Sequence, residues 1–378
     1  MKPSAPLRIA HIDTGLTLRG GQRQLLLLAR GLRVHGHEQR IVCPEASELC
    51  ARARAEGFSV LALPQGDFRH LRGTWQLRRR VLQDNLIVLH AHDGAGQTIS
   101  WLASLGTGVR RVASRRVTYL PRRRIDYRLK YKYTCHAVIA VSQFIGEILR
   151  STGVPDEMIN VIPDGIEIPE HLPDAAARLA TRAKWGLIGR EFVVGHLGNI
   201  SPEKGQDIAV RASEILATQF PEAKLVLGGS VTADDLGRLG LAAAVSSGRV
   251  LLAGYQENLF EFFSGLDLYI MPSRSEGLGS SALLAMAHGL PVIATKVGGL
   301  PEIVEEGKTG WLIAPESPKA LANAIAAAAA DPARLREMSI NARERAKQFS
   351  AQAMVERTEA LYNRLIGFPA DHRAAIAD

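Results

Sequence analysis

Short apolar runs alternate with amphipathic segments along the first half of the chain. The first run spans residues 7–13, and residues 22–35 then place leucines at helical spacing. Apolar runs of strand length return at 41–44, 58–63, 86–92, 109–114, 137–142 and 160–163. Unbroken apolar strands that alternate with helices are typical of a parallel sheet covered by helices on both faces.

The same alternation starts again in the second half, after a segment with prolines at 163, 169 and 173. Further apolar runs lie at 192–198, 224–227, 250–253, 267–270, 291–294 and 311–313. This pattern predicts an α/β protein with two doubly wound, Rossmann-like domains that face each other across a cleft. We expect the domains at 1–165 and 166–348, followed by a helical segment at 349–378.

Composition and charge narrow the class of protein. Hydrophobic residues make up 46% of the 378 residues, and no apolar run reaches the ~18 residues that a membrane span needs. We expect no signal peptide, and three cysteines without a disulfide or metal pattern favour the cytoplasm. Residues 1–165 hold 25 Lys and Arg against 13 Asp and Glu, whereas the remaining residues hold 21 against 25. The two halves therefore should bind different partners.

Doubly wound sheets bind ligands at the carboxyl ends of their strands, so the loops there carry the candidate chemistry. The first loop ends in Gly20 and Gly21, which either let a ligand approach the backbone or only form a tight turn. In the next, His90 alternates inward and is expected in the core, whereas His92 ends the strand as a candidate partner of sugar or phosphate. We expect no zinc there, because the sequence offers no third ligand nearby.

Residues 110–132 contain ten basic residues, one acid and three tyrosines. Such a segment is either a solvated basic helix or a docking surface for an anionic partner, a phospholipid or a phosphorylated glycolipid. Nucleic acid would suit the charge, but no nucleic-acid motif accompanies it.

A lysine and an acid stand out in the second half. Ser201 and Pro202 suit a helix start, which would place Lys204 in the first helical turn against the helix dipole and mark it as a phosphate ligand. Glu276 follows an apolar strand in a glycine-rich turn, and Ser280 could cap the helix after it. An acid beside the amides of Gly277, Leu278, Gly279 and Ser280 suits an anionic ligand with hydroxyls.

Together these loops resemble the retaining GT-B glycosyltransferases, in particular the bacterial family that builds surface polysaccharide and lipopolysaccharide (glycosyl transferases group 1 type). The resemblance covers nearly the whole chain and is most specific from Pro272 to Glu302. Weaker matches support it, namely Gly20-Gly21, His90-Ala91-His92, Val141-Ser142, Val161 to Ile166 and Glu203-Lys204-Gly205.

The resemblance implies an enzyme that moves a sugar from a nucleotide diphosphate to a glycolipid or polysaccharide acceptor, without metal or cofactor. The second domain would hold the donor and the first the acceptor, with the last helix crossing back. Lys204 would contact the diphosphate, with the Gly277 to Ser280 amides beside it and Gly20-Gly21 beneath. Glu276 would bond the sugar hydroxyls, and His92 would lie beside the transferred sugar. Such an enzyme would work in the cytoplasm, at the inner face of the membrane.

Two positions depart from the family pattern. Asn199 stands where an arginine is common, and Leu284 stands where a second acid would bond the nucleotide ribose. Losing a charge-assisted hydrogen bond costs roughly 1.5–3 kcal/mol, which weakens binding without abolishing it.

Of three other functions, two remain open and one is disfavoured. A sugar-nucleotide epimerase shares the architecture, and a binding protein with weakened catalysis would explain Asn199 and Leu284. An NAD-dependent enzyme is disfavoured, because the first loop lacks the GxGxxG spacing and no acid ends the second strand.

Overall fold

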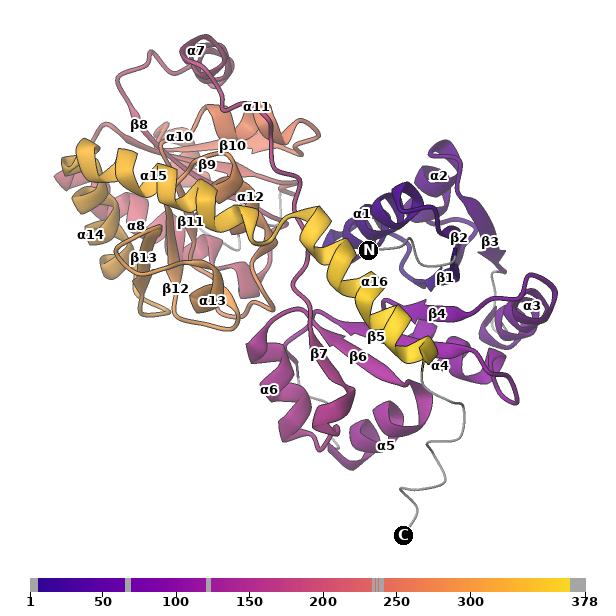
Figure 1. Ribbon diagram of the computed structural model, residues 1–378. Helices are drawn as coiled ribbons and strands as arrows, with labels where there is room; N and C mark the ends of the chain where they lie inside the picture. Colours follow the sequence, from indigo (N-terminus) through magenta and orange to yellow (C-terminus); the bar gives the residue numbers. More distant parts are fainter. Residues whose placement is uncertain are drawn as a thin grey trace. The chain divides into compact units, whose positions relative to one another are not determined.

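The computed structural model describes residues 6–64, 69–119, 124–232, 235, 237 and 241–367 (Figure 1). The chain divides into two compact units. Unit 1 contains the residues up to Gly165 together with those from Ala351 onward, and unit 2 is Ile166–Ser350. Each unit is built on one parallel sheet, which confirms the predicted α/β class with two doubly wound domains.

Unit 1 has a seven-stranded parallel sheet in the order β3-β2-β1-β4-β5-β6-β7. The chain changes direction across the sheet between β1 and β4, which is the switch point where doubly wound sheets bind ligands. His11 of β1 lies beside His90 of β4 in the strand register. The strands are β1 (Arg8–Ile12), β2 (Glu38–Pro44), β3 (Ser59–Leu63), β4 (Val88–Ala91), β5 (Arg110–Arg115), β6 (Ala137–Ala140) and β7 (Ile159–Val161).

Helices cover both faces of this sheet, because successive strand residues point alternately to two cores. Ile9 and Val88 pack towards α1 and α16, whereas Ile12 and Leu89 pack towards α3 and α4. Ser47, Asp93 and Ser142 cap α2, α4 and α6. The helices are α1 (Gly20–Val34), α2 (Glu48–Ala55), α3 (Arg69–Gln83), α4 (Gly94–Ala103), α5 (Arg124–Thr134), α6 (Gln143–Ser151), the 3₁₀ turn η1 (Asp156–Met158) and α16 (Ala351–Gly367).

The last helix, α16, packs on α1 in unit 1 (Figure 1). The approach is close: a Cβ on Gly31 would lie 2.3 Å from Val355. His35 and His37 both contact the Glu359 carboxylate, at 2.6 and 3.0 Å. The part of the predicted 349–378 segment beyond Gly367 lies outside the described residues.

Unit 2 has a six-stranded parallel sheet in the order β10-β9-β8-β11-β12-β13, with its switch point between β8 and β11. Its strands are β8 (Phe192–Leu197), β9 (Ala223–Gly228), β10 (Val250–Gly254), β11 (Leu268–Met271), β12 (Val292–Thr295) and β13 (Gly310–Ile313). Its helices are α7 (Ala175–Lys184), η2 (Pro202–Lys204), α8 (Gln206–Gln219), α10 (Leu241–Ser246), α11 (Leu259–Ser264), α12 (Ser280–Ala287), α13 (Leu300–Ile303), α14 (Pro318–Ala330) and α15 (Pro332–Lys347).

The cysteines and the lengths of the helices can also be compared with the sequence analysis. The three cysteines are free and buried, as small core residues. Among the described helices, none is long and apolar enough to cross a membrane.

Candidate active site

Two loops at the switch point of unit 2 bring Lys204 and Glu276 together. Lys204 follows β8 and Glu276 follows β11, and these strands are neighbours in the sheet. The Lys204 Nζ atom donates a hydrogen bond to Glu276 Oε1, and Ser273 Oγ donates to the same oxygen at 3.3 Å. The Glu276 side chain is only 9% exposed and that of Lys204 is 32% exposed. The carboxylate is therefore held from within the fold, whereas the ammonium group remains open to solvent.

The backbone around Lys204 differs from the prediction. Pro202–Lys204 forms a 3₁₀ turn, and Gly205, at φ +68°, separates it from α8. Pro202 begins a helical turn that contains Lys204, as predicted, but it is a 3₁₀ turn, so Lys204 precedes α8 and does not lie in its first turn. A Cβ at residue 205 would lie 2.0 Å from the Pro272 carbonyl oxygen, so glycine is needed for the two loops to touch.

The turn after Glu276 reaches α12 without a side-chain cap. Gly279 is the N-cap at φ +102°, and Ser280 is the first helical residue. The predicted capping role of Ser280 is therefore wrong, because a left-handed glycine makes the turn. Among the described residues, no side chain caps this helix by a hydrogen bond, so the first amides of α12 are available to an anion.

Arg274 binds the two loops to each other. Its backbone N–H donates to the Glu203 carbonyl at 2.7 Å and its Nη1 donates to the Pro202 carbonyl at 2.8 Å. The same guanidinium makes a bidentate pair with Asp207 of α8, at 2.8 Å for each bond. Arg274 thus fixes the segment that carries Lys204 against the segment that carries Glu276. The sequence around Arg274 gives no indication of this role.

The two positions that depart from the family pattern, Asn199 and Leu284, both hold uncharged side chains. Asn199 is exposed and its carbonyl oxygen accepts from Gln206 at 3.0 Å. Leu284 is half-buried on α12. His196, the residue before the last of β8, is buried, and its Nε2 has no hydrogen-bond partner among the described residues. Burial and the charge of Lys204 lower the pKa of His196 to about 3, so this imidazole is neutral.

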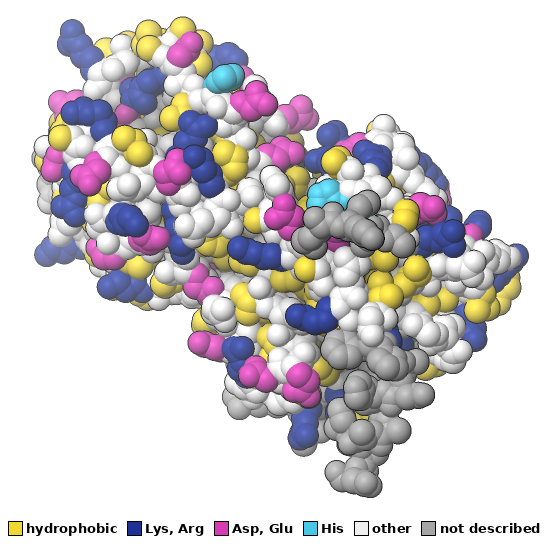
Figure 2. Space-filling view, viewed as in Figure 1, with side chains coloured by type: hydrophobic (Ala, Val, Ile, Leu, Met, Phe, Trp, Pro, Cys, Tyr) yellow, Lys and Arg dark blue, Asp and Glu magenta, His cyan; other side chains and the backbone are white. Residues whose placement is uncertain are grey.

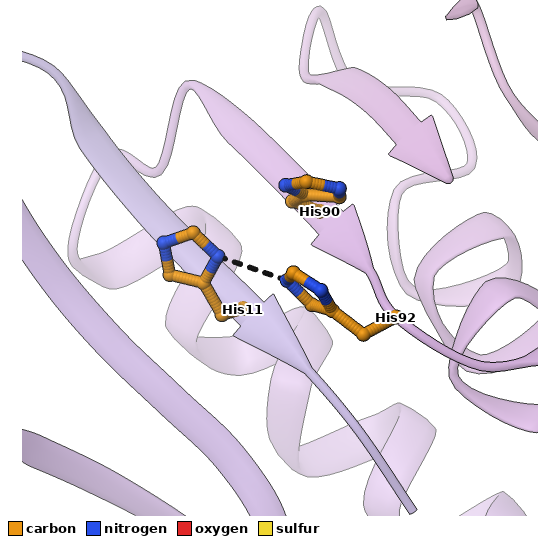
Figure 3. A group of neighbouring side chains, drawn as sticks. All are labelled: His11, His90 and His92. Carbon is orange, nitrogen blue, oxygen red and sulfur yellow. Dashed lines mark hydrogen bonds between the residues drawn. The ribbon is translucent and has the colours of Figure 1, made fainter. Parts of the chain in front are cut away.

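Three buried histidines meet at the switch point of unit 1 (Figure 3). His11 comes from β1 and His90 from β4, and His92 is the residue directly after β4. Nδ1 of His11 lies 3.2 Å from Nε2 of His92, and the rings of His90 and His92 are tilted by 30° with centroids 4.1 Å apart. His90 is buried, as expected of a core histidine.

The expectation that no third ligand accompanies His90 and His92 is wrong, because strand pairing brings His11 to them. One ring nitrogen from each lies within 4.8 Å of the others. All six ring nitrogens nevertheless have partners within unit 1. His90 bonds Tyr362 Oη at 2.6 Å and Ser114 Oγ at 2.8 Å, and His11 Nε2 bonds Gln39 Oε1 at 3.1 Å. Metal binding would require several of these bonds to break.

Arg116 sets the tautomer of His92. Its Nη1 lies 3.4 Å from His92 Nδ1, while its Nε donates to both carboxylate oxygens of Asp164, at 2.9 and 3.2 Å. A guanidinium only donates, so His92 Nδ1 accepts and His92 Nε2 carries the proton that it donates to His11. Arg116 therefore donates to Asp164 on one side and to His92 on the other, and His92 donates onward to His11.

Burial makes these imidazoles weak bases. The pKa of His11 falls from 6.5 to about 4 through burial. Burial lowers the pKa of His90 and His92 well below the usual range, and the Arg116 charge adds to the effect. At neutral pH the cluster is thus uncharged.

Gly20 and Gly21 lie in the first turn of α1, rather than before it. A Cβ on either would meet no atom within 4 Å, so packing within the described chain does not require glycine here. The loop before them is held by Asp13, whose Oδ1 accepts from the Gly15 amide and from Gln22 Nε2, each at 2.9 Å. Burial and the neighbouring Asp93 raise the pKa of Asp13.

The basic stretch 110–132 is not one surface helix. It forms β5 and α5, and Arg111 and Arg115 are 7% and 4% exposed. Arg111 bonds the Thr134 carbonyl at 2.8 Å, and Arg115 bonds that of Tyr119. Sheet packing thus removes part of the predicted surface charge. Residues 120–123 and the side chains of 124–127 lie outside the description.

Sequence reasoning missed His11, Asp13, Arg116 and Asp164. Each lies in a strand of the sheet or within three residues of the end of one, which was the available signal. Their pairing joins residues as far apart as 116 and 164, so no local pattern reveals it.

Two family models match the two units. Residues 177–345 match "Glycosyl transferases group 1", and residues 18–169 match "Glycosyltransferase Family 4". Each unit thus carries a glycosyltransferase family domain. The family resemblance drawn from the loops is thereby confirmed.

Two curated relatives of this chain are named as mannosyltransferases. The lipopolysaccharide core biosynthesis mannosyltransferase LpcC of Rhizobium leguminosarum bv. viciae is 34% identical over 237 residues, 61% of this chain and 65% of that protein. A GDP-mannose-dependent alpha-(1-6)-phosphatidylinositol monomannoside mannosyltransferase of Mycolicibacterium smegmatis is 28% identical over 348 residues, 86% and 90% of the two chains. The match thus spans less than two thirds of the first relative and most of the second.

Solved structures share the fold of this chain. Anabaena Alr3699/HepE, solved in complex with UDP, superposes with a TM-score of 0.83 at 22% identity, over 95% of this chain and 100% of that one. A glycosyltransferase from Rickettsia africae gives a TM-score of 0.86 at 19% identity, over 97% and 100%. At such identities the likeness establishes the GT-B fold alone.

Proposed function

We propose that this chain transfers a hexosyl group from a nucleotide diphosphate to a glycolipid or polysaccharide acceptor of the bacterial envelope, with retention of anomeric configuration. The observation that carries the proposal is the direct pairing of Lys204 with Glu276 at the switch point of unit 2. A cation for the diphosphate and a carboxylate for sugar hydroxyls lie side by side there, next to an uncapped helix start.

The chemical step follows from these groups. The bond between the anomeric carbon and the diphosphate oxygen breaks, and negative charge develops on the diphosphate. Lys204 and the amides at the start of α12 stabilise that charge in place, which lowers the barrier. The acceptor hydroxyl attacks from the face that the diphosphate leaves and gives its proton to the departing phosphate. The proposal assigns no step to a metal, so a chelator should leave turnover unchanged.

Unit 1 is proposed to bind the acceptor and to border the transferred sugar through His92. The bond of 3.4 Å from Arg116 to His92 Nδ1 is long, and a sugar hydroxyl can replace it. Gly20 and Gly21 are proposed to lie under the diphosphate, because the space above them is open. The remaining basic side chains of 110–132 are proposed to face an anionic membrane on its cytoplasmic side.

Mannose is the first sugar to test, because two relatives are named as mannosyltransferases, one of them GDP-mannose-dependent. UDP-glucose is the second, because Alr3699/HepE was solved with it. Thermal unfolding with a panel of nucleotide sugars, followed by product analysis with and without an acceptor lipid extract, separates three outcomes. Sugar transfer supports the proposal, isomerisation without acceptor indicates an epimerase, and binding without turnover indicates a binding protein.

Lys204→Ala tests the assignment of the site. We expect turnover to fall by at least about a hundredfold, because developing charge loses its cation. Lys308→Ala is a matched control, since Lys308 is a surface lysine of unit 2 with a 65% exposed side chain. Equal rates in Lys204→Ala and wild type would refute the role.

A further inference from the structure

Helix α3 has two apolar faces. Leu77 and Val81 are 0% and 4% exposed and pack into the core of unit 1. On the other side, Leu71, Trp75 and Leu82 are 65%, 60% and 59% exposed. The core face already satisfies the amphipathic pattern of a surface helix, so this second apolar face requires its own explanation.

The exposed residues form a narrow stripe. At 3.6 residues per turn, Leu71, Trp75 and Leu82 fall within about 40° of one another and extend about 16 Å along the helix axis. Arg78 flanks the stripe on one side and Arg72 and Arg79 flank it on the other, by the same count. Apolar side chains between arginines make this face suited to a boundary between an apolar and an anionic phase.

Contacts in the structure reinforce the stripe. The Arg79 guanidinium lies 5.0 Å from the centre of the Trp75 ring. Arg78 Nη1 donates to the carbonyl oxygens of Ala103 and Leu105, at 3.3 and 2.6 Å, at the end of α4. Leu105 is itself 46% exposed and so extends the apolar area. We call Leu71, Trp75, Leu82 and Leu105 the α3 patch.

The charge of α3 has one sign. Its sequence RHLRGTWQLRRRVLQ contains five arginines and no acid. The nearest acid along the chain, Asp84, lies 3.7 Å from Arg80 and 2.8 Å from Arg40, and Arg80 is not among the arginines that flank the stripe. In the space-filling view, hydrophobic and basic side chains gather over the position of α3 (Figure 2).

We propose that the α3 patch docks unit 1 on an anionic lipid bilayer. Tryptophan and leucine enter the headgroup boundary, and Arg72 and Arg79 bind lipid phosphates. A protein partner or a second copy of the chain would bury the same apolar area, but neither accounts for arginines on both sides of it. Docking on a bilayer rests on the proposed function in one respect, because an enzyme whose acceptor is carried by a lipid has to reach that acceptor at the bilayer.

Vesicle binding tests the proposal with the full chain. Wild-type protein should co-sediment with vesicles of phosphatidylcholine and phosphatidylglycerol and much less with phosphatidylcholine alone. Leu71→Ser with Trp75→Ser and Leu82→Ser should weaken binding at least about tenfold. Arg72→Gln with Arg79→Gln should weaken it by about fivefold for each arginine. The fluorescence of Trp75 is obtained by subtracting the emission spectrum of Trp75→Phe from that of the wild type. This difference spectrum should shift to the blue when the protein binds vesicles.

Matched controls use exposed residues elsewhere. Ile340→Ser and Leu179→Ser remove side chains that are 67% and 59% exposed in unit 2. Arg52→Gln with Arg54→Gln removes the same charge from α2, where the side chains are 59% and 53% exposed. These variants should bind vesicles as wild type does. Thermal unfolding checks that every variant folds.

Three results would overturn the proposal. The first is equal vesicle binding by the patch variants and the controls. The second is a change in native mass on patch substitution, which would assign the patch to self-association. The third is insensitivity to phosphatidylglycerol. Lys204→Ala should bind vesicles normally, so a failure of the proposed sugar transfer leaves this result intact, and the reverse also holds.

Discussion

Lys204 Nζ donates directly to Glu276 Oε1, so the cation proposed for the diphosphate and the carboxylate proposed for the sugar neutralise each other. Donor binding has to exchange this ion pair for contacts with the two ends of the donor. The pair therefore opposes binding of a ligand that offers only one of those ends.

For Glu276→Ala we expect opposite effects on two ligands. A free nucleoside diphosphate should bind about two- to fivefold more tightly, because Lys204 loses a partly exposed ion pair. The nucleotide sugar should bind about ten- to a hundredfold more weakly, because its hydroxyls lose a charged acceptor. Calorimetric titration measures both, with Glu344→Ala as a control whose side chain is 63% exposed. Parallel weakening of the two ligands would contradict the assignment.

Leu284→Glu should strengthen nucleotide binding. The family pattern places an acid at this position to bond the ribose, and the side chain of Leu284 is only half-buried, so a longer polar chain can be accommodated. A recovered charge-assisted hydrogen bond of roughly 1.5–3 kcal/mol corresponds to about ten- to a hundredfold in affinity. Leu284→Gln offers a neutral side chain of similar length as the control. No gain with either side chain would indicate that this chain holds the ribose elsewhere.

Arg116 should determine which nitrogen of His92 carries the proton. In wild type, ¹⁵N NMR should find His92 and His11 as neutral imidazoles protonated at Nε2, since Arg116 only donates. In Arg116→Ala, His92 should populate both tautomers, and turnover should fall by at least about tenfold. Arg128→Ala, an exposed arginine on α5, should change neither quantity. A single tautomer in Arg116→Ala would show that His11 sets the proton position instead.

The three buried histidines should make the folded state sensitive to acid. Because the pKa of His11 is about 4 in the folded chain and 6.5 in the unfolded chain, the unfolded chain binds the extra proton between these values. Stability is then complete above about pH 6.5 and falls as the pH decreases towards 4, by about 3 kcal/mol for His11 alone.

Urea unfolding across that pH range measures the slope. His11→Asn should flatten it, whatever its effect on stability at neutral pH, and the exposed His171→Asn should not. A steeper or unchanged slope in His11→Asn would argue against a neutral, buried His11.

The architecture could be predicted because each strand is a local apolar run and each helix has its own period. The order of strands then follows from the preference of such chains for doubly wound sheets. The same reasoning placed Lys204 and Glu276 in loops that follow strands, where the structure has them. The exact starts of the helices were harder to predict. Gly205 and Gly279, both in the left-handed conformation, precede the first residues of α8 and α12, whereas the sequence suggested Ser201 and Ser280 as caps.

What the sequence could not provide were pairings between distant segments. His11 joins His90 and His92 only because β1 and β4 are neighbours. The basic stretch 110–132 looked like a surface because its charges are consecutive, yet the sheet buries Arg111 and Arg115. The stripe on α3 was equally hidden, since apolar residues at helical spacing also describe a core face.

The bonds of Arg274 have a consequence for how fast a donor can be captured. Since one guanidinium ties the segment of Lys204 to that of Glu276 and to α8, both segments move as one body. The entropy cost of ordering these two segments belongs to the folding of unit 2, so a nucleotide that arrives binds to a preorganised site. Association should then occur in a single phase whose rate rises linearly with ligand concentration, without a plateau from loop rearrangement.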